Sequence, residues 1–188
     1  MKKIRFLFVM IFLASSLLVL GERATVAQSP TAIAIPTATA EGCDQVPDYL
    51  ESRQKIMNEL LTDMESIFPN VATPILENGD QLFGAMMTMT ANQSIELAKA
   101  YDSVANKIDQ IDAPAVAAFY NDLQVQLYRL SADVFEEMST SDQTAAGDKF
   151  GDQLGAMGEA VGLAGTAATS VCPAFAEVVE FDKTQATI

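Results

Sequence analysis

Apolar residues from Pro47 onward recur at steps of three and four, which is the period of an amphipathic helix, and no stretch alternates with period two. The helices predicted by this pattern cover residues 47–68, 80–111, 114–138 and 141–169, with a short closing helix over 174–182. The expected fold class is therefore all-α, an up-and-down four-helix bundle with a short C-terminal helix.

Proline and polar residues predict where these helices end. The first helix stops at Phe68, because Pro69 disfavours a helical residue before it. The connection 69–79 contains two prolines and an Asn-Gly pair, and we expect one short helical turn there. Thr140 and Gln143 have the spacing of a capping box, which predicts the start of the last long helix.

Residues 1–27 resemble an export signal, with a basic start, an apolar run over 6–20 and small residues up to Ala27. An uncut signal anchor is the alternative, but the apolar run is shorter than the roughly 20 residues of a spanning helix. We expect cleavage, no stable membrane insertion afterwards, and a secreted, periplasmic or cell-surface protein. Residues 28–42, rich in Pro, Thr and Ala, predict a flexible spacer. The helical domain then covers 43–182, followed by a frayed end over 183–188.

The sequence contains two cysteines, Cys43 and Cys172. In an exported chain the two are expected to form one disulfide bond, which would close nearly the whole domain. Such a bond needs the start of the first helix and the end of the fourth at the same end of the bundle, as an even number of alternating helices provides. A redox-active thiol pair is the alternative, and the absence of a C-x-x-C spacing disfavours it.

Glycines recur at steps of three and four in the predicted helix 141–169. The stripe consists of Gly147, Gly151, Gly155, Gly158, Gly162 and Gly165. Six glycines forgo roughly 5 kcal/mol of helix propensity relative to alanine, so we expect close packing to offset this cost. A small-residue surface on the predicted helix 80–111 matches the stripe; it consists of Gly84, Ala91, Ala98 and Ala105. The sequence therefore predicts a close approach of these two helices.

Two other interpretations of the glycine stripe stay open. The stripe could remain exposed and receive a helix from a second copy or another protein. Insertion into a membrane is less favoured, because Asp148, Lys149, Asp152 and Glu159 interrupt the segment. The exposure of Gly155 and Gly162 separates internal packing from an external contact.

The formal net charge is −14, and removing residues 1–27 takes away four positive charges and one negative charge, which leaves −17. A charge of this sign argues against nucleic acid and anionic lipid as partners, because both are bound through basic patches. It favours a dispersed, soluble chain.

The chain contains no histidine, which removes the usual general base and the commonest transition-metal ligand. It also has no P-loop, no G-x-G-x-x-G segment after a strand and no EF-hand loop. Acidic pairs at helical spacing, such as Glu59 with Asp63, are interpreted as solvated faces rather than cation sites. We therefore expect no enzyme activity, no cofactor and no bound metal.

Three methionines, Met86, Met87 and Met89, resemble the thioether sets that bind Cu(I). Met86 and Met89 fall on the apolar stripe of their helix, whereas Met87 points about 100° away. Core packing is the favoured interpretation, and a soft-metal or ligand role for Met86 and Met89 is the alternative.

The function these observations favour is an exported, non-catalytic helical module that binds a protein or assembles with itself. The alternative is a carrier of a small apolar ligand or metal inside the bundle. Residues that would line such a site are Met86, Met89, Tyr101, Phe119 and Tyr120. A filled core at their level would argue against the carrier.

Overall fold

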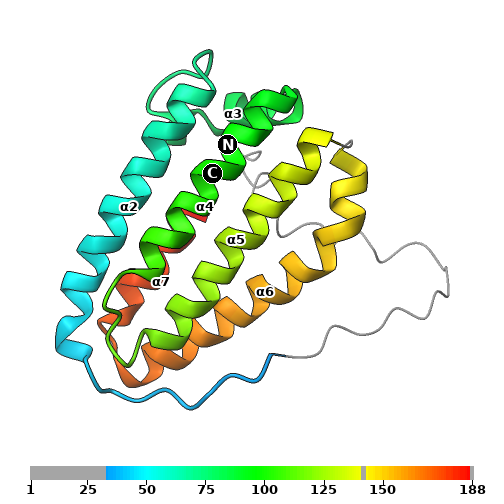
Figure 1. Cartoon of the computed structure of the whole chain (residues 1–188). Helices are drawn as coiled ribbons and strands as arrows, with labels where there is room; N and C mark the ends of the chain where they lie inside the picture. Colours follow the sequence, from blue (N-terminus) through cyan, green and yellow to red (C-terminus); the bar gives the residue numbers. More distant parts are fainter. Residues whose placement is uncertain (1–32, 141–142, 187–188) are drawn as a thin grey trace, which may run out of the picture.

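The computed structural model describes residues 33–140 and 143–186, and within these ranges the chain is helical, with no strand (Figure 1). The elements are η1 (Cys43–Gln45), α2 (Val46–Ile67), η2 (Ile75–Asn78), α3 (Gly79–Met87), α4 (Ala91–Asp109), α5 (Ala118–Thr140), α6 (Gln143–Val171) and α7 (Phe175–Ala186). The predicted all-α class is confirmed. The predicted count of four principal helices and one short one is wrong, because six α-helices are present in the described residues.

Several predicted boundaries agree with the structure. Helix α2 carries Pro47 in its first turn and ends at Ile67, just before Phe68 and Pro69. The helical turn expected within 69–79 is η2. The predicted closing helix is α7, which extends to Ala186 and therefore past the predicted end at residue 182.

The prediction of one continuous helix over 80–111 is wrong, because the chain leaves the helical path between Met87 and Ala91. Thr90 is the N-cap of α4: its hydroxyl oxygen accepts the backbone N–H of Gln93 at 3.3 Å, and its own N–H donates to Gln93 Oε1 at 3.0 Å. This reciprocal capping box satisfies two donors that a helix start leaves unpaired. The Gln93 Nε2 also donates to the carbonyl of Ile67 at 3.0 Å, which ties the start of α4 to the end of α2.

The structure gives Thr140 a different role from the N-cap of the capping box predicted at Thr140 and Gln143. Thr140 is the last residue of α5, and its hydroxyl donates to the carbonyl of Glu137. Gln143 begins α6, while residues 141–142 between them lie outside the described residues.

The principal helices form a ring in which each contacts the next: α2, α4, α5, α6 and α7, with α7 returning to α2. In Figure 1, α4 lies between α2 and α5, and α5 lies between α4 and α6. The four longest helices alternate in direction, and α7 passes behind α4 in this view. The short connections from α4 to α5 and from α5 to α6 favour this antiparallel order, whereas η2 and α3 lie in the longer connection between α2 and α4.

The ring encloses two apolar clusters. The first is centred on α2 and α4 and includes Met57, Leu60, Leu97, Val104 and Ile108. The second joins the start of α2 and α5 to α6 and α7 and includes Val46, Leu123, Ala164, Phe175 and Val178. Burial of these side chains supplies the main driving force for the fold.

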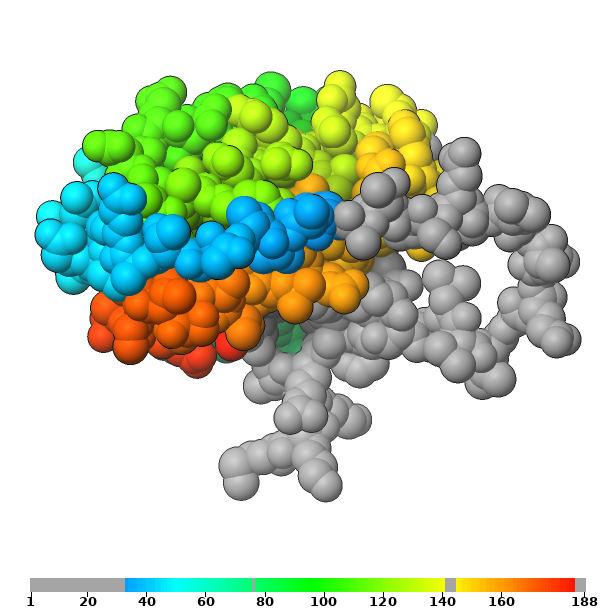
Figure 2. Space-filling model, turned by 90° about the horizontal axis from the view of Figure 1, so that it is seen from below, coloured from blue at the N-terminus to red at the C-terminus, as the bar shows by residue number. Residues whose placement is uncertain are grey.

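The described part of the predicted spacer, residues 33–42, is extended and lies against the domain. Ile33 and Ile35 are half-buried against the second apolar cluster, and the N–H of Val116 donates to the carbonyl of Glu41 at 3.0 Å. Figure 2 shows this blue segment crossing the domain between the green helices and the orange part of α6. Residues 28–32 and the predicted signal peptide 1–27 lie outside the described residues. Among the helices of residues 33–140 and 143–186, none combines the length and apolarity needed to cross a membrane.

Gly42 marks the turn between this segment and η1. Its φ is +80°, and a Cβ added there would lie 2.7 Å from Cβ of Pro114. Because both the backbone angle and the space favour glycine, we expect Gly42→Ala to lower the free energy of unfolding by about 1 to 3 kcal/mol. Urea denaturation followed by circular dichroism measures the change. An unchanged midpoint would contradict the tight packing of this turn.

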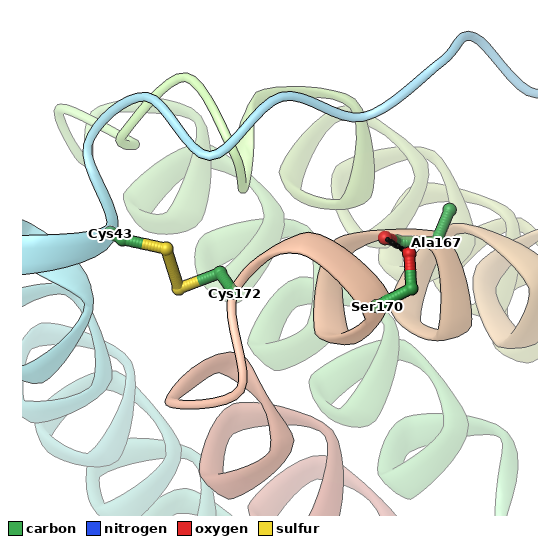
Figure 3. Close-up of a disulfide and its surroundings, with 4 residues drawn as sticks. All are labelled: Cys43, Ala167, Ser170 and Cys172. Atoms are coloured by element: carbon green, nitrogen blue, oxygen red, sulfur yellow. Dashed lines mark hydrogen bonds between the residues drawn. A yellow bond between two sulfur atoms is a disulfide. The ribbon is translucent and has the colours of Figure 1, made fainter.

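The predicted disulfide bond is confirmed. Cys43 in η1 and Cys172 just after α6 are bonded, and their Cα atoms are 5.8 Å apart. Figure 3 shows the bond joining the segment that enters α2 to the end of α6, where the hydroxyl of Ser170 donates to the carbonyl of Ala167 at 2.7 Å. The bond and the ring place the start of α2 and the end of α6 together.

Candidate functional site

The most distinctive chemical feature of the described residues is a buried arginine. Arg53 lies on the apolar face of α2, between Tyr49 and Ile56, and its exposed fraction is 0%. An arginine is almost never fully buried unless its charge is paired, because removing it from water is costly. The chemistry of the site therefore depends on which group pairs with this guanidinium.

The partner is the carboxylate of Asp182 on α7. Arg53 Nη2 donates to Asp182 Oδ1 at 2.9 Å and to Oδ2 at 2.8 Å. Two donors from α5 converge on the same Oδ2: the Tyr120 hydroxyl at 2.6 Å and Gln124 Nε2 at 3.3 Å. The side chain of Asp182 is 11% exposed, so the ion pair is shielded from water. Together, the ion pair and the two donors from α5 join α2, α5 and α7, which are far apart in the sequence.

A second chain of hydrogen bonds fixes the guanidinium from the other side. Arg53 Nη1 donates to the hydroxyl oxygen of Tyr49 at 3.3 Å, and that hydroxyl donates to Asn121 Oδ1 at 2.9 Å. Asn121 Nδ2 donates to the carbonyl of Ile108 at 3.2 Å. The bond to Ile108 sets the orientation of the Asn121 amide. Each group in this series of hydrogen bonds is therefore defined as a donor or an acceptor in each contact. Arg53 is thereby positioned by α4 and α5 as well as by α7.

The electrostatics of the cluster follow from burial and from the ion pair. Burial is the largest single influence and lowers the pKa of Arg53, but Asp182 and the surrounding tyrosines together outweigh it, so the pKa of the guanidinium is raised. Arg53 stays charged at every pH at which the protein folds. The guanidinium also lies over the rings of Tyr49 and Tyr120, 5.6 and 5.8 Å from their centroids. Arg53 Nε has no hydrogen-bond partner in the described part of the chain.

All four tyrosines of the chain have a raised pKa. Burial is the largest cause for each, and it brings the pKa of Tyr49 and of Tyr101 to about 12. Burial and the negative charge of Asp182 both raise the pKa of Tyr120 and of Tyr128. Each phenol therefore keeps its proton in the folded state at a pH where an unfolded chain loses it.

This shift predicts a loss of stability at alkaline pH. Since the folded-state pKa lies above the ordinary value of about 10, the stabilisation is complete below pH 10 and is lost as the pH rises toward 12. For Tyr49 alone the loss is roughly 2 to 3 kcal/mol. We expect tyrosinate absorbance at 295 nm to rise together with the loss of helical circular dichroism. Titration near pH 10 with the helix signal intact would contradict the burial of these phenols.

The predicted carrier residues are divided between the two apolar clusters. Met86, Met89 and Tyr101 pack against the first apolar cluster. Phe119 and Tyr120 belong to the second cluster. The Tyr101 ring packs against the rings of neighbouring side chains on α5, and Tyr120 packs edge-on against an aromatic ring of α7. Within residues 33–140 and 143–186, no group of three or more Cys, Asp or Glu side chains is arranged to hold a metal ion.

The predicted close approach between the glycine stripe and the segment 80–111 is wrong. In the ring, α5 separates α4 from α6, and α6 packs against α5 and α7. Gly84 is exposed on α3, and a Cβ placed on it would have no described atom within 4 Å. Ala91 is exposed and Ala98 half-buried, while Ala105 is fully buried in the first cluster. The small residues of α3 and α4 therefore do not form one packing surface against α6.

The glycine stripe follows the edge of the buried face of α6. Gly158 and Gly165 are buried, Gly151 and Gly155 are half-buried, and Gly147 and Gly162 are exposed. A Cβ on Gly165 would lie 3.0 Å from Val179 Cγ2 and 3.2 Å from Tyr120 Cε2, so this glycine allows α7 to approach. A Cβ on Gly147 or Gly162 would have no described atom within 4 Å.

The different surroundings of Gly162 and Gly165 predict that replacement by alanine changes the free energy of unfolding in opposite directions. Gly162→Ala should raise the free energy of unfolding by about 1 kcal/mol, because it adds helix propensity where nothing is crowded. Gly165→Ala should lower it by about 1 kcal/mol, because overpacking against Val179 and Tyr120 outweighs the same gain. Urea denaturation of the matched pair measures both. Equal shifts of the same sign would contradict the difference in packing.

Sequence reasoning missed Arg53 and Asp182 as a site. A signal was present: Tyr49, Arg53, Ile56 and Leu60 follow the helical period, which places a charge in an apolar stripe. Asp182 likewise lies seven residues after Phe175 on one face. Each charged residue on an apolar face indicates a buried charge that needs a partner.

Comparisons with protein-family models, with curated proteins and with solved structures found no match to this chain. A function for the chain must therefore be inferred from the geometry of its described residues.

Proposed function

We propose that the chain is an exported, non-catalytic helical module that binds another helix, from a second copy or a different protein, along the outer part of the glycine stripe of α6. The observation that carries this proposal is the open space at Gly162, which is exposed and has no described atom within 4 Å of its Cβ position. A glycine there costs about 1 kcal/mol of helix propensity and gains no packing within the chain. Close approach of an external backbone would supply that packing.

The surroundings of this surface support the same proposal. Leu163, next in sequence, is 51% exposed, which is unusual for a large apolar side chain. The half-buried Gly155 continues the stripe from Gly162 toward the start of the helix. Exposed apolar side chains next to a flat backbone surface are typical of protein contact sites.

The chemistry of the buried cluster supports a non-catalytic role. Its carboxylate, guanidinium and phenols are hydrogen-bonded to one another, and their contacts join α2, α5 and α7. A catalytic group must reach a substrate, whereas these groups are held inside the ring. The cluster stabilises the scaffold that presents α6.

The test is association of the oxidised chain beginning at Gln28. We expect sedimentation velocity over a range of concentrations, or capture from the native host, to detect a complex that Gly162→Leu weakens at least tenfold. Gln153→Leu is the matched control, because Gln153 is also exposed on α6 but lies on the opposite flank of its buried face.

The two variants separate the outcomes. A complex weakened by Gly162→Leu and retained by Gln153→Leu supports the stripe as the contact surface. A complex weakened equally by both would show that the contact lies elsewhere. A monomer with no captured partner would remove the proposed function.

A further inference from the structure

We propose that Arg53, Tyr120 and Gln124 form a carboxylate-binding site inside the bundle, and that Asp182 of α7 is its resident, tethered ligand. We call these three residues the carboxylate site. All of its donors come from α2 and α5, while α7 contributes only the carboxylate. The donors on α2 and α5 thus act as a receptor, and the carboxylate on α7 acts as a ligand that is covalently tethered to it through the polypeptide.

The hydrogen bonds that orient the donors of the carboxylate site do not involve α7, although Tyr49 and Tyr120 also pack against the ring of Phe175 on that helix. Arg53 Nη1 is held by Tyr49, which is held in turn by Asn121. Gln124 Nε2 donates to the hydroxyl oxygen of Tyr120 at 3.0 Å, a contact within α5. Because these bonds do not involve Asp182, the donors should keep their positions when the carboxylate leaves. Preorganised donors of this kind lower the cost of binding an anion.

The guanidinium has binding capacity that Asp182 does not use. Arg53 Nε is buried and has no hydrogen-bond partner among the described residues. Asp182 contacts the guanidinium through Nη2 alone. A free carboxylate, which is not constrained by a helix backbone, could accept from Nη2 and Nε together in the paired geometry that guanidinium and carboxylate prefer. The chemical class of ligand is therefore a small monocarboxylate.

The position of Asp182 in α7 makes it a latch for the second half of that helix. The first half is fixed by Phe175 and Val178, both fully buried, and by the disulfide bond at Cys172. Beyond Val178 the described side chains are half-buried or exposed, and Lys183 and Thr184 are exposed. Residues 179–186 therefore depend on Asp182 more than residues 175–178 do.

The experiment removes the tethered carboxylate and supplies a free one. In Asp182→Ala, we expect amide hydrogen exchange over residues 179–186 to increase at least tenfold while α4 and the first half of α7 stay protected. Sodium formate should restore protection in a saturable manner and raise the melting temperature by about 4 °C at ten times its Kd. Sodium chloride at equal ionic strength should not do so.

Two matched proteins test whether formate acts at the carboxylate site. The unsubstituted protein should not respond, because Asp182 occupies the site. The double variant Arg53→Met with Asp182→Ala should not respond, because it lacks the cation. A folded Asp182→Ala protein that responds to formate no more than to chloride would overturn the proposal, as would an equal response of the double variant.

A second variant covers the case in which Asp182→Ala does not fold. Asp182→Asn keeps the shape of the side chain but removes its charge, so it should selectively increase exchange over residues 179–186. Exchange equal to that of the unsubstituted protein would overturn the role of Asp182 as a latch.

Discussion

Replacing Arg53 by methionine is expected to lower the free energy of unfolding by about 3 to 5 kcal/mol. The guanidinium is the cation that compensates Asp182 in a site shielded from water, and its removal leaves a shielded carboxylate with only Tyr120 and Gln124 as donors. Methionine keeps much of the apolar volume of the arginine stem, so the loss reports mainly on the charge. Urea denaturation followed by circular dichroism measures it.

The matched control is the double replacement Arg53→Met with Asp182→Leu. Removing both charges also removes the unpaired carboxylate, so most of the lost stability should return. A double-mutant cycle isolates the coupling between the two side chains. If Arg53→Met alone changed the stability by less than about 0.5 kcal/mol, the ion pair would not hold α7 to α2.

Removing the disulfide bond is expected to lower the free energy of unfolding by an amount similar to that of Arg53→Met. Cys43 and Cys172 are 129 residues apart, and in the chain-entropy account a loop of that length contributes about 5 kcal/mol by restricting the unfolded chain. The double replacement Cys43→Ala with Cys172→Ala should therefore lower the midpoint of urea unfolding markedly. Comparison of oxidised and reduced unsubstituted protein gives an independent measurement.

If the two contacts act independently, the decrease in the free energy of unfolding caused by removing the disulfide bond should add to the decrease caused by Arg53→Met. Cys172 is buried at the start of the turn into α7, so reduction could also loosen that helix. Hydrogen exchange distinguishes the two effects, because loosening would be confined to α7. A denaturation midpoint that does not depend on reduction would contradict the entropy account.

The helix boundaries that local chemistry determines could be predicted from the sequence. Pro69 limits α2, and Pro173 separates α6 from α7. Each depends on a residue that cannot supply a helical backbone N–H, which is a local property. The disulfide bond could also be predicted, because a chain with two cysteines has only one intramolecular pairing.

The break between α3 and α4 was missed for a specific reason. Leu82, Met86 and Met89 continue the apolar period through the break, so the hydrophobic pattern shows no interruption. The capping box of Thr90 and Gln93 was the available signal. Capping chemistry, rather than the apolar period, decides the start of α4.

The wrong partner for α6 has a different cause. Small residues on two helices show that each can be approached closely, but they do not show by what. The order of helices around the ring places α5 between α4 and α6, and Gly165 instead admits Val179 and Tyr120. Which helices become neighbours is a property of the whole chain. The same limitation hid the pairing of Arg53 with Asp182, since each residue indicates a buried charge without naming its partner.

The bond between Cys43 and Cys172 turns residues 43–172 into a covalent circle with two tails. A protease that cuts one peptide bond anywhere within this circle produces no separate fragment, since the two new ends stay joined through sulfur. The nicked chain keeps α2 and α7 in one molecule, so Arg53 and Asp182 can find each other again. Such a chain would migrate as one species until its disulfide bond is reduced.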